Sequence, residues 1–170
     1  MKTHAPVDQL VALVSEHWPQ LNHPNAPGLW SLYRTHDRLL EVYASIIAPF
    51  GLQVADSEAL CALRSSDAQY TLSPKALGYF MLISSGGLTK VLKRLEGQGW
   101  VERLANPEDG RSQLVKLTPA GKVCIEAAMG AVSEFEKQVS SVLTHDEHAQ
   151  LYSMLDRLTQ KIDELSQSTP

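Results

Sequence analysis

Cationic side chains are concentrated in the segment from residue 84 to residue 116, where they could donate hydrogen bonds to phosphate. They are Lys90, Lys93, Arg94, Arg103, Arg111 and Lys116. Four acidic residues oppose them, so the segment has a net charge of +2 and the remainder −6, within a total of −4. A locally basic segment on an acidic chain is typical of proteins that bind DNA selectively. The plainer alternative is a charged helix and hairpin that contact only water.

Helical periodicity predicts two short helices joined by a brief turn in this part of the chain. Ser73-Pro74 is a typical helix start, and the first helix is expected to end near Leu82. The second helix begins at a serine cap and runs to about residue 98, where Gly99 can end it. Its inward apolar stripe consists of Leu88, Val91, Leu92 and Leu95. Such a pair with a basic second helix indicates a helix-turn-helix, and two merely packed helices are the alternative.

The opposite face of the second helix supplies the candidate DNA contacts. Small residues at its beginning permit close approach to the major groove, and the backbone N–H groups there can meet phosphates. The expected contacts are Ser84, Ser85, Gly86, Thr89, Lys90, Lys93 and Arg94. Thr89 and Lys90 lie nearer the entering end and are expected to influence base preference. Lys93 and Arg94 are exposed by the periodicity and are expected to contact phosphate or to pack internally.

A β-hairpin is predicted directly after these helices, in the stretch "WVERLANPEDGRSQLVKLT". One strand lies around Val101 and the returning strand around Val115, with "NPEDG" as the turn. A helix-turn-helix followed by a hairpin is a winged helix, in which the hairpin reaches a neighbouring minor groove. Arg111 at the turn is therefore expected to contact DNA, with Asp109 orienting its guanidinium. The alternative is an Asp-Arg pair that only braces the turn.

The stretch from Ser84 to Gly121 resembles the core of the MarR family of bacterial transcription regulators. The family motif, Asp-x-Arg followed by a strand and Leu-Thr-x-x-Gly, is matched by Asp109, Arg111, Leu117, Thr118 and Gly121. The wider resemblance extends from about Leu29 to Leu165. It implies a homodimeric winged-helix repressor whose DNA affinity is lowered by a small aromatic or phenolic ligand, or in some branches responds to oxidation.

The predicted architecture is mainly α with a small antiparallel β-hairpin: a winged helix-turn-helix with N- and C-terminal dimerisation helices. We expect N-terminal helices in residues 1–50, the DNA-binding lobe in 51–118, C-terminal dimerisation helices in 119–166 and a tail in 167–170. Capped helices beginning at Thr118-Pro119 and at Thr144 carry more apolar side chains than one small winged domain can cover. A two-fold dimer would cover them and present recognition helices about 34 Å apart to a pseudo-palindromic double-stranded operator.

An additional N-terminal helix ending in "EHWPQL" resembles the urate-responsive, PecS-like branch of the family, in which a tryptophan joins an aspartate and two arginines. By that resemblance Trp18 and Arg103 match, Glu58 falls where the aspartate would be, and Val91 replaces the other arginine. Because an anionic ligand would lose one bidentate partner, urate itself is not expected. The predicted effector site comprises Trp18, Trp30, Tyr33, His36, Asp37, Glu58 and Arg103. For Trp18 the alternative is an anchor for helix packing.

The sequence contains little that indicates an enzyme. His145 and His148 with Glu147 lie in a capping turn, so we expect no metal site there, and we expect no cofactor. Cys61 and Cys124 form no CxxC pair and are expected to be buried reduced thiols.

No signal peptide or long apolar run is evident, which predicts a cytoplasmic protein. Two alternatives stay open: a redox-responsive regulator of the same fold, and a winged-helix interaction protein that does not bind DNA.

Overall fold

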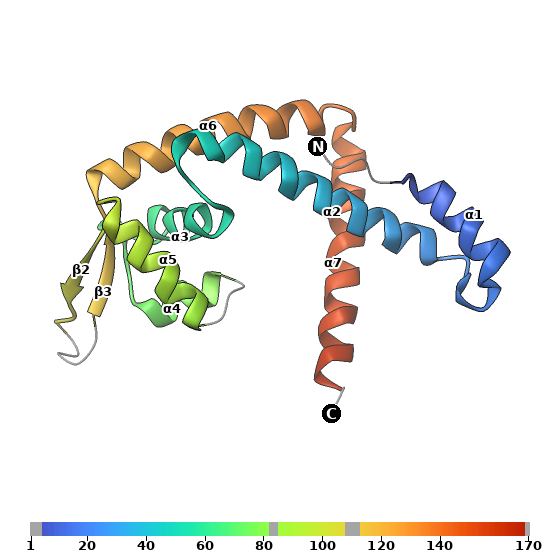
Figure 1. Ribbon diagram of the computed structural model, residues 1–170, viewed down its shortest axis with the longest axis horizontal. Helices are drawn as coiled ribbons and strands as arrows, with labels where there is room; N and C mark the ends of the chain where they lie inside the picture. Colours follow the sequence, from blue (N-terminus) through green and yellow to red (C-terminus); the bar gives the residue numbers. More distant parts are fainter. Residues whose placement is uncertain (1–4, 82–84, 108–112, 169–170) are drawn as a thin grey trace. The chain divides into compact units, whose positions relative to one another are not determined.

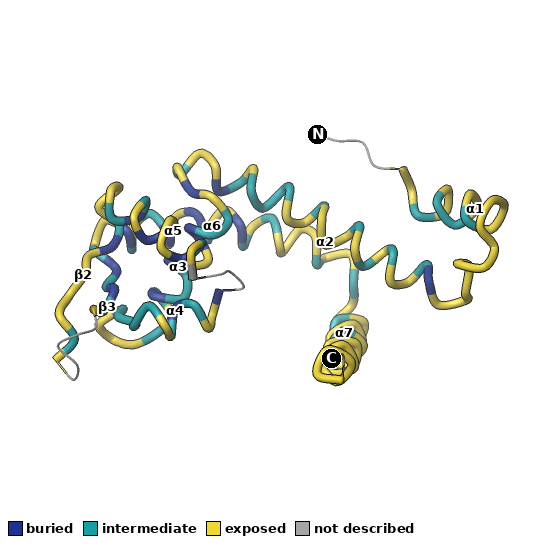
Figure 2. Tube along the Cα trace, turned by 60° about the horizontal axis from the view of Figure 1, so that its bottom comes forward, coloured by how far each residue is buried: buried dark blue, intermediate teal, exposed yellow. Residues whose placement is uncertain are grey.

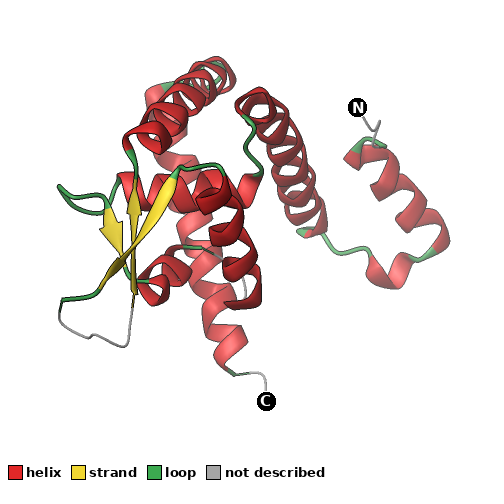
Figure 3. Ribbon diagram, turned by 60° about the vertical axis from the view of Figure 1, so that its left-hand side comes forward, coloured by secondary structure: helices red, strands yellow, loops and turns green. Residues whose placement is uncertain are grey.

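The chain folds mainly into helices with a small antiparallel sheet, as a computed structural model that describes residues 5–81, 85–107 and 113–168 shows (Figures 1 and 3). Two compact units are present, Met1–Met129 and Gly130–Pro170. The first contains α1 (Val7–His17), η1 (Pro19–Leu21), α2 (Ala26–Ile47), η2 (Ala48–Phe50), α3 (Val54–Arg64), β1 (Thr71–Leu72), α4 (Pro74–Phe80), α5 (Ser85–Gly97), β2 (Val101–Ala105), β3 (Gln113–Leu117) and the first half of α6 (Pro119–Ser140). The second contains the rest of α6 and α7 (His145–Gln167).

The caps expected from the sequence begin two of these helices. Ser73 Oγ accepts a hydrogen bond from the backbone N–H of Ala76 at 3.1 Å at the start of α4. Thr144 Oγ1 accepts from the N–H of Glu147, whose carboxylate accepts from the Thr144 N–H at 2.7 Å. This backbone hydrogen bond lowers the pKa of Glu147. The helix α4 ends at Phe80, slightly before the predicted end near Leu82, which lies outside the described residues.

The core of the first unit lies where α3, α4, α5, the sheet and α6 meet. Its apolar members are less than one-tenth exposed and come from all of these elements. They include Leu60, Leu63, Leu77, Leu88, Val91, Leu92, Leu95, Val115, Leu117 and Ile125. The apolar stripe predicted for the second helix of the pair is therefore confirmed as the buried face of α5. The C-terminal half of α2 adds Ile47 to the buried set.

The predicted hairpin is confirmed, but the sheet has a third strand. β2 pairs antiparallel with β3, with Val101 opposite Leu117 and Arg103 opposite Val115. β1 pairs with the other edge of β3, so that the strand order is β1-β3-β2. Nothing in the sequence indicated this third strand, because a two-residue strand has no periodicity of its own to detect. β3 is thus the central strand, and it carries the buried residues Val115 and Leu117.

Hydrogen bonds of the motif Leu-Thr-x-x-Gly join the start of α6 to the turn that follows α5. Thr118 Oγ1 accepts from the N–H of Gly121 at 3.0 Å and donates to the carbonyl of Gly99 at 2.7 Å. The Thr118 N–H donates to the Trp100 carbonyl at 3.0 Å. A Cβ atom on Gly121 would overlap that same Trp100 carbonyl. Glycine is therefore required at this position by close backbone approach rather than by an unusual φ.

Among the described residues, no single helix is both long and apolar enough to cross a membrane. One bent pair, Ala26–Phe50 with Val54–Arg64, meets the length and composition criteria only when both helices are taken together. Core helices of folded domains meet the same criteria, so this pair is weak evidence for a membrane span.

We expect Gly121→Ala to lower the free energy of unfolding by about 1–3 kcal/mol, because the added methyl group overlaps backbone that cannot move without shifting α5 or β2. Thermal or urea unfolding followed by circular dichroism measures this. Gly130→Ala is the matched control, since nothing lies within 4 Å of its Cβ position on the same helix. The control is expected to stabilise by about 0.5–1 kcal/mol. Equal stability of the two variants would contradict the close-approach explanation.

Candidate nucleic-acid interface

The exposed face of α5 carries most of the predicted DNA contacts that the structure describes. Gly86, Thr89, Lys90 and Lys93 are exposed on the side opposite the buried stripe. Ser85 begins the helix, whereas Ser84 lies outside the described residues. The two ammonium groups are therefore directed away from the core, as contact with a polyanion requires. Figure 2 shows that the buried positions gather where α3, α5 and the sheet lie.

Arg94 does not share this exposed face. Its guanidinium turns toward α3, where Nε lies 2.9 and 3.0 Å from the two carboxylate oxygens of Asp56 and Nη2 lies 2.5 Å from Oδ1. The Asp56 side chain is fully buried, and that of Arg94 is 34% exposed. The prediction of an exposed Arg94 is therefore wrong, and the alternative that this side chain packs internally describes its position. An ion pair with a buried carboxylate holds it there.

Asp56 has a second hydrogen bond, within α3 itself. Its Oδ2 accepts from the backbone N–H of Gln53 at 3.0 Å, which satisfies one of the donors left free at the start of a helix. One carboxylate thus caps α3 and holds a side chain of α5. Sequence reasoning missed it because the two partners are 38 positions apart. The acidic residue in the first turn of a helix was the only available signal.

The hairpin carries two ion pairs in its described part. Lys116 Nζ on β3 lies 3.8 Å from Glu102 on β2, across the strand pair. Arg103 on β2 forms an ion pair with Glu96 on α5, which joins the hairpin to the recognition helix. Both pairs are partly exposed and contribute little stability individually. Arg111 and Asp109 lie outside the described residues, so the DNA contact expected of Arg111 stays a prediction.

The residues predicted to bind an effector are spread over the first unit. Trp18 follows α1, while Arg103 lies in β2, and Figure 1 shows α1 beside the N-terminal part of α2, away from the sheet. Trp18 is 59% exposed and Tyr33 66% exposed. His36 Nδ1 lies 3.3 Å from Oδ1 of the neighbouring Asp37.

Three further residues of the predicted effector site lie on three different elements of the fold. Arg103 pairs with Glu96, Glu58 is exposed on α3, and Trp30 is partly buried on α2. Val91, which stands where the urate-responsive branch has an arginine, is a core residue with 4% exposure. The single chain therefore does not assemble a site from these residues, and the assignment of an effector to them stays a prediction.

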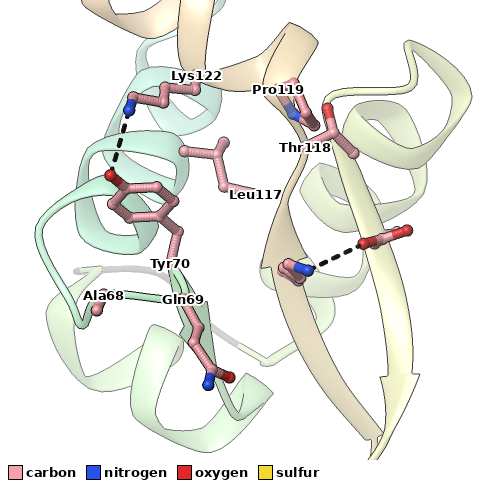
Figure 4. Close-up of a pocket in the computed structure, with 9 residues that line it drawn as sticks. Ala68, Gln69, Tyr70, Leu117, Thr118, Pro119 and Lys122 are labelled. Carbon is pink, nitrogen blue, oxygen red and sulfur yellow. Dashed lines mark hydrogen bonds and ion pairs between the residues drawn. The ribbon is translucent and has the colours of Figure 1, made fainter.

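A cavity of about 530 Å³ lies between the loop before β1, the strand β3 and the start of α6 (Figure 4). Its lining residues are Ala68, Gln69, Tyr70, Glu102, Lys116, Leu117, Thr118, Pro119 and Lys122. Tyr70 is the one non-glycine residue with positive φ, at 56°, among those described. Lys122 Nζ donates to its hydroxyl at 3.2 Å, and Arg64 lies 4.9 Å from the ring centroid. Lys122 Nζ lies 5.0 Å from the same centroid, so both cations are within cation–π distance of the ring.

The two cysteines are unfavourable sites for oxidation. Cys61 on α3 and Cys124 on α6 are both partly buried and free. Burial raises the pKa of the Cys61 thiol, with a further contribution from the Glu58 carboxylate, and burial raises the pKa of Cys124. A raised pKa keeps both groups in the thiol form at neutral pH, whereas reactive cysteines are thiolates.

Glu147 and His148, near the start of α7, both have structural partners. Glu147 completes the cap with Thr144, and His148 Nε2 lies 2.9 Å from the Ser140 carbonyl. Among the described residues, no group of three or more histidine, cysteine or acidic side chains is arranged to hold a metal ion.

Together these elements define a winged helix-turn-helix protein: α4 and α5 form the helix pair, β2 and β3 form the wing, and the exposed face of α5 is cationic. The sequence model of the MarR family matches residues 58–113. The multiple antibiotic resistance protein MarR of Salmonella typhimurium is 32% identical over 131 residues, which cover 76% of this chain and 87% of that protein. The chain belongs to the MarR family of transcriptional regulators.

Two further relatives agree with this assignment. The HTH-type transcriptional regulator PecS of Dickeya dadantii is 29% identical over 122 residues, which cover 72% of each protein. A solved structure of a mutant MarR from Escherichia coli complexed with operator DNA has 25% sequence identity and a TM-score of 0.67, covering 91% of this chain and 99% of that chain. These relatives are described as regulators of transcription, which is consistent with a non-enzymatic protein.

We expect Lys90→Ala to change base preference, because Lys90 lies near the entering end of α5, and Lys93→Ala to weaken binding to all sequences alike. The measurement is the affinity for a selected operator and for a set of single-base variants of it, by fluorescence anisotropy. A Lys90→Ala protein that loses affinity by the same factor on every sequence would contradict this division of roles.

Proposed function

We propose that this protein is a sequence-selective, homodimeric repressor whose affinity for double-stranded DNA is lowered by a small aromatic or phenolic ligand. The single observation that carries the DNA-binding part is the cationic face of α5, which projects from a helix-turn-helix whose other face is core. Lys90 and Lys93 on that face can reach base edges and phosphates in a major groove. Membership of the MarR family supports regulation of transcription.

The homodimer is supported by the composition of the second unit. α7 has 23 residues and none of them is buried. Its apolar side chains recur at helical spacing along one face, with Leu151, Leu158 and Ile162 each at least 40% exposed. An amphipathic helix of this kind is stabilised mainly by packing of its apolar face. A second copy of the chain would supply that packing and also pair the recognition helices on one operator.

Response to a ligand is supported by the family resemblance, and the seven predicted effector residues are our proposal for where it binds. A coupling free energy of about 1–3 kcal/mol between the two sites would weaken DNA binding roughly 5- to 150-fold. A redox switch is the second candidate mechanism, but the raised pKa of both cysteines disfavours it.

DNA binding is tested with the duplex immediately upstream of the protein's own gene, using a shuffled duplex of equal length as control. We expect the upstream duplex to bind about 10³-fold or more tightly than the shuffled one at physiological salt. Equal affinity for both duplexes would favour the winged-helix interaction protein instead.

The same assay, repeated with a panel of small aromatic acids and phenols, tests ligand response. Because coupling is reciprocal, an effector that weakens DNA binding must itself bind more weakly to the DNA complex by the same factor. Calorimetry of the free and DNA-bound protein measures that factor. A compound whose affinity is identical in both states is not the effector.

We expect Leu158→Glu to shift the protein from dimer to monomer, because the charge would be buried in an apolar contact between two copies. Analytical ultracentrifugation measures the association state. Ser153→Glu is the matched control, since it places the same charge on the other side of α7. A Leu158→Glu protein that remains dimeric at the same concentration as the control would remove this face of α7 from the interface.

A further inference from the structure

The contact between Asp56 and Arg94 joins the recognition helix to α3 at one fixed geometry. Three donor–acceptor distances of 2.5 to 3.0 Å connect two guanidinium nitrogens to both carboxylate oxygens. A planar guanidinium bound in this way permits little rotation about the contact, unlike an ammonium group on a flexible stem. The pair is therefore suited to fix orientation.

The α3 end of this contact is rigid. Asp56 is fully buried, and its carboxylate is also held by the Gln53 N–H. One turn further along the same helix, Ala59, Leu60 and Leu63 are all fully buried. Arg94 is thus attached to a helix whose inward face lies in the core of the first unit.

The α5 end of the contact lies beside the exposed cations. Arg94 directly follows Lys93 and stands four positions after Lys90, so it lies one helical turn along from Lys90. A rotation of α5 about its own axis would move both lysines relative to the groove. The buried stripe alone limits this rotation less strictly, because Leu and Val side chains make contacts without a fixed direction.

We propose, on the basis of the proposed DNA-binding function, that Arg94 is a positioning residue for sequence selectivity rather than a phosphate contact. Held by Asp56, it sets the rotation of α5 and hence which base edges Thr89 and Lys90 can reach. A buried ion pair is a poor source of net stability compared with apolar packing of equal volume. The ion pair does, however, supply hydrogen bonds of fixed direction, which apolar packing cannot.

The test compares Arg94→Lys with Lys93→Gln on two probes: a duplex selected by the wild-type protein from a random library, and a shuffled duplex of equal length. Arg94→Lys keeps the charge but loses the two-pronged contact. We expect it to lose about tenfold or more in affinity for the selected duplex, the effect of misplacing one base contact. Its affinity for the shuffled duplex and its salt dependence are expected to remain those of the wild type.

Lys93→Gln serves as the phosphate-contact control. We expect it to weaken both probes by the same factor and to reduce the slope of log K against log salt by about 1.8 for the two subunits of a dimer. The same response from Arg94→Gln, with selectivity retained, would overturn the proposal by making Arg94 a phosphate contact. Full selectivity in Arg94→Lys would overturn it as well.

A double-variant cycle separates positioning from misfolding. Asp56→Asn with Arg94→Gln leaves a neutral pair of similar volume and no unpaired buried charge, and thermal unfolding verifies that it is folded at the assay temperature. If the two residues act through one another, the loss of selectivity in the double variant equals the larger single loss. Additive losses would show that Arg94 acts independently of Asp56.

Hydrogen exchange gives a readout that does not depend on DNA. We expect the amides of residues 88–97 to exchange faster in Arg94→Lys than in the wild type, while those of α7 are unchanged. Unchanged exchange in α5 would contradict the proposal. If the wild-type protein selects no duplex from the library, the proposed function fails, and the exchange measurement still decides whether Arg94 orients α5.

Discussion

The architecture depends on the close approach of α6 to the backbone between α5 and β2. Gly121 permits that approach, and the Thr118 hydroxyl both accepts a hydrogen bond from α6 and donates one to Gly99 in the turn after α5. The central strand β3 leads directly into this contact. The recognition helix, the wing and α6 therefore all meet at this contact. A change in the backbone distance between Gly121 and Trp100 would therefore displace all three elements.

The C-terminal part of α5 is held by both backbone and side-chain interactions. At its C-terminal end the chain turns through Gly99, where φ is +70°, and the backbone then bonds to Thr118. In its last turn Arg94 bonds to Asp56, and Glu96 pairs with Arg103 of the wing.

Sequence reasoning succeeded where the signal is local. The Ser73-Pro74 start, the Thr144 cap and the buried stripe of α5 are each set by residues within one or two turns of one another, so spacing alone reveals them. The family motif extended this to the wing. Sequence reasoning failed where interacting residues are distant in the chain. β1 pairs with a strand more than 40 positions away, and the carboxylate that binds Arg94 lies 38 positions earlier. Tyr70, whose backbone conformation is fixed by the turn into β1, gave no signal either.

None of the residues of α7 is buried, so in the proposed dimer the stability of this helix would depend on protein concentration. If a second copy covers this helix, dilution uncovers it, and the free energy of unfolding then falls with the logarithm of concentration. A dimeric regulator of this kind would lose order and DNA occupancy together as its cellular level drops. Its copy number would then act as a threshold, because below it neither the C-terminal helix nor the paired recognition helices persist.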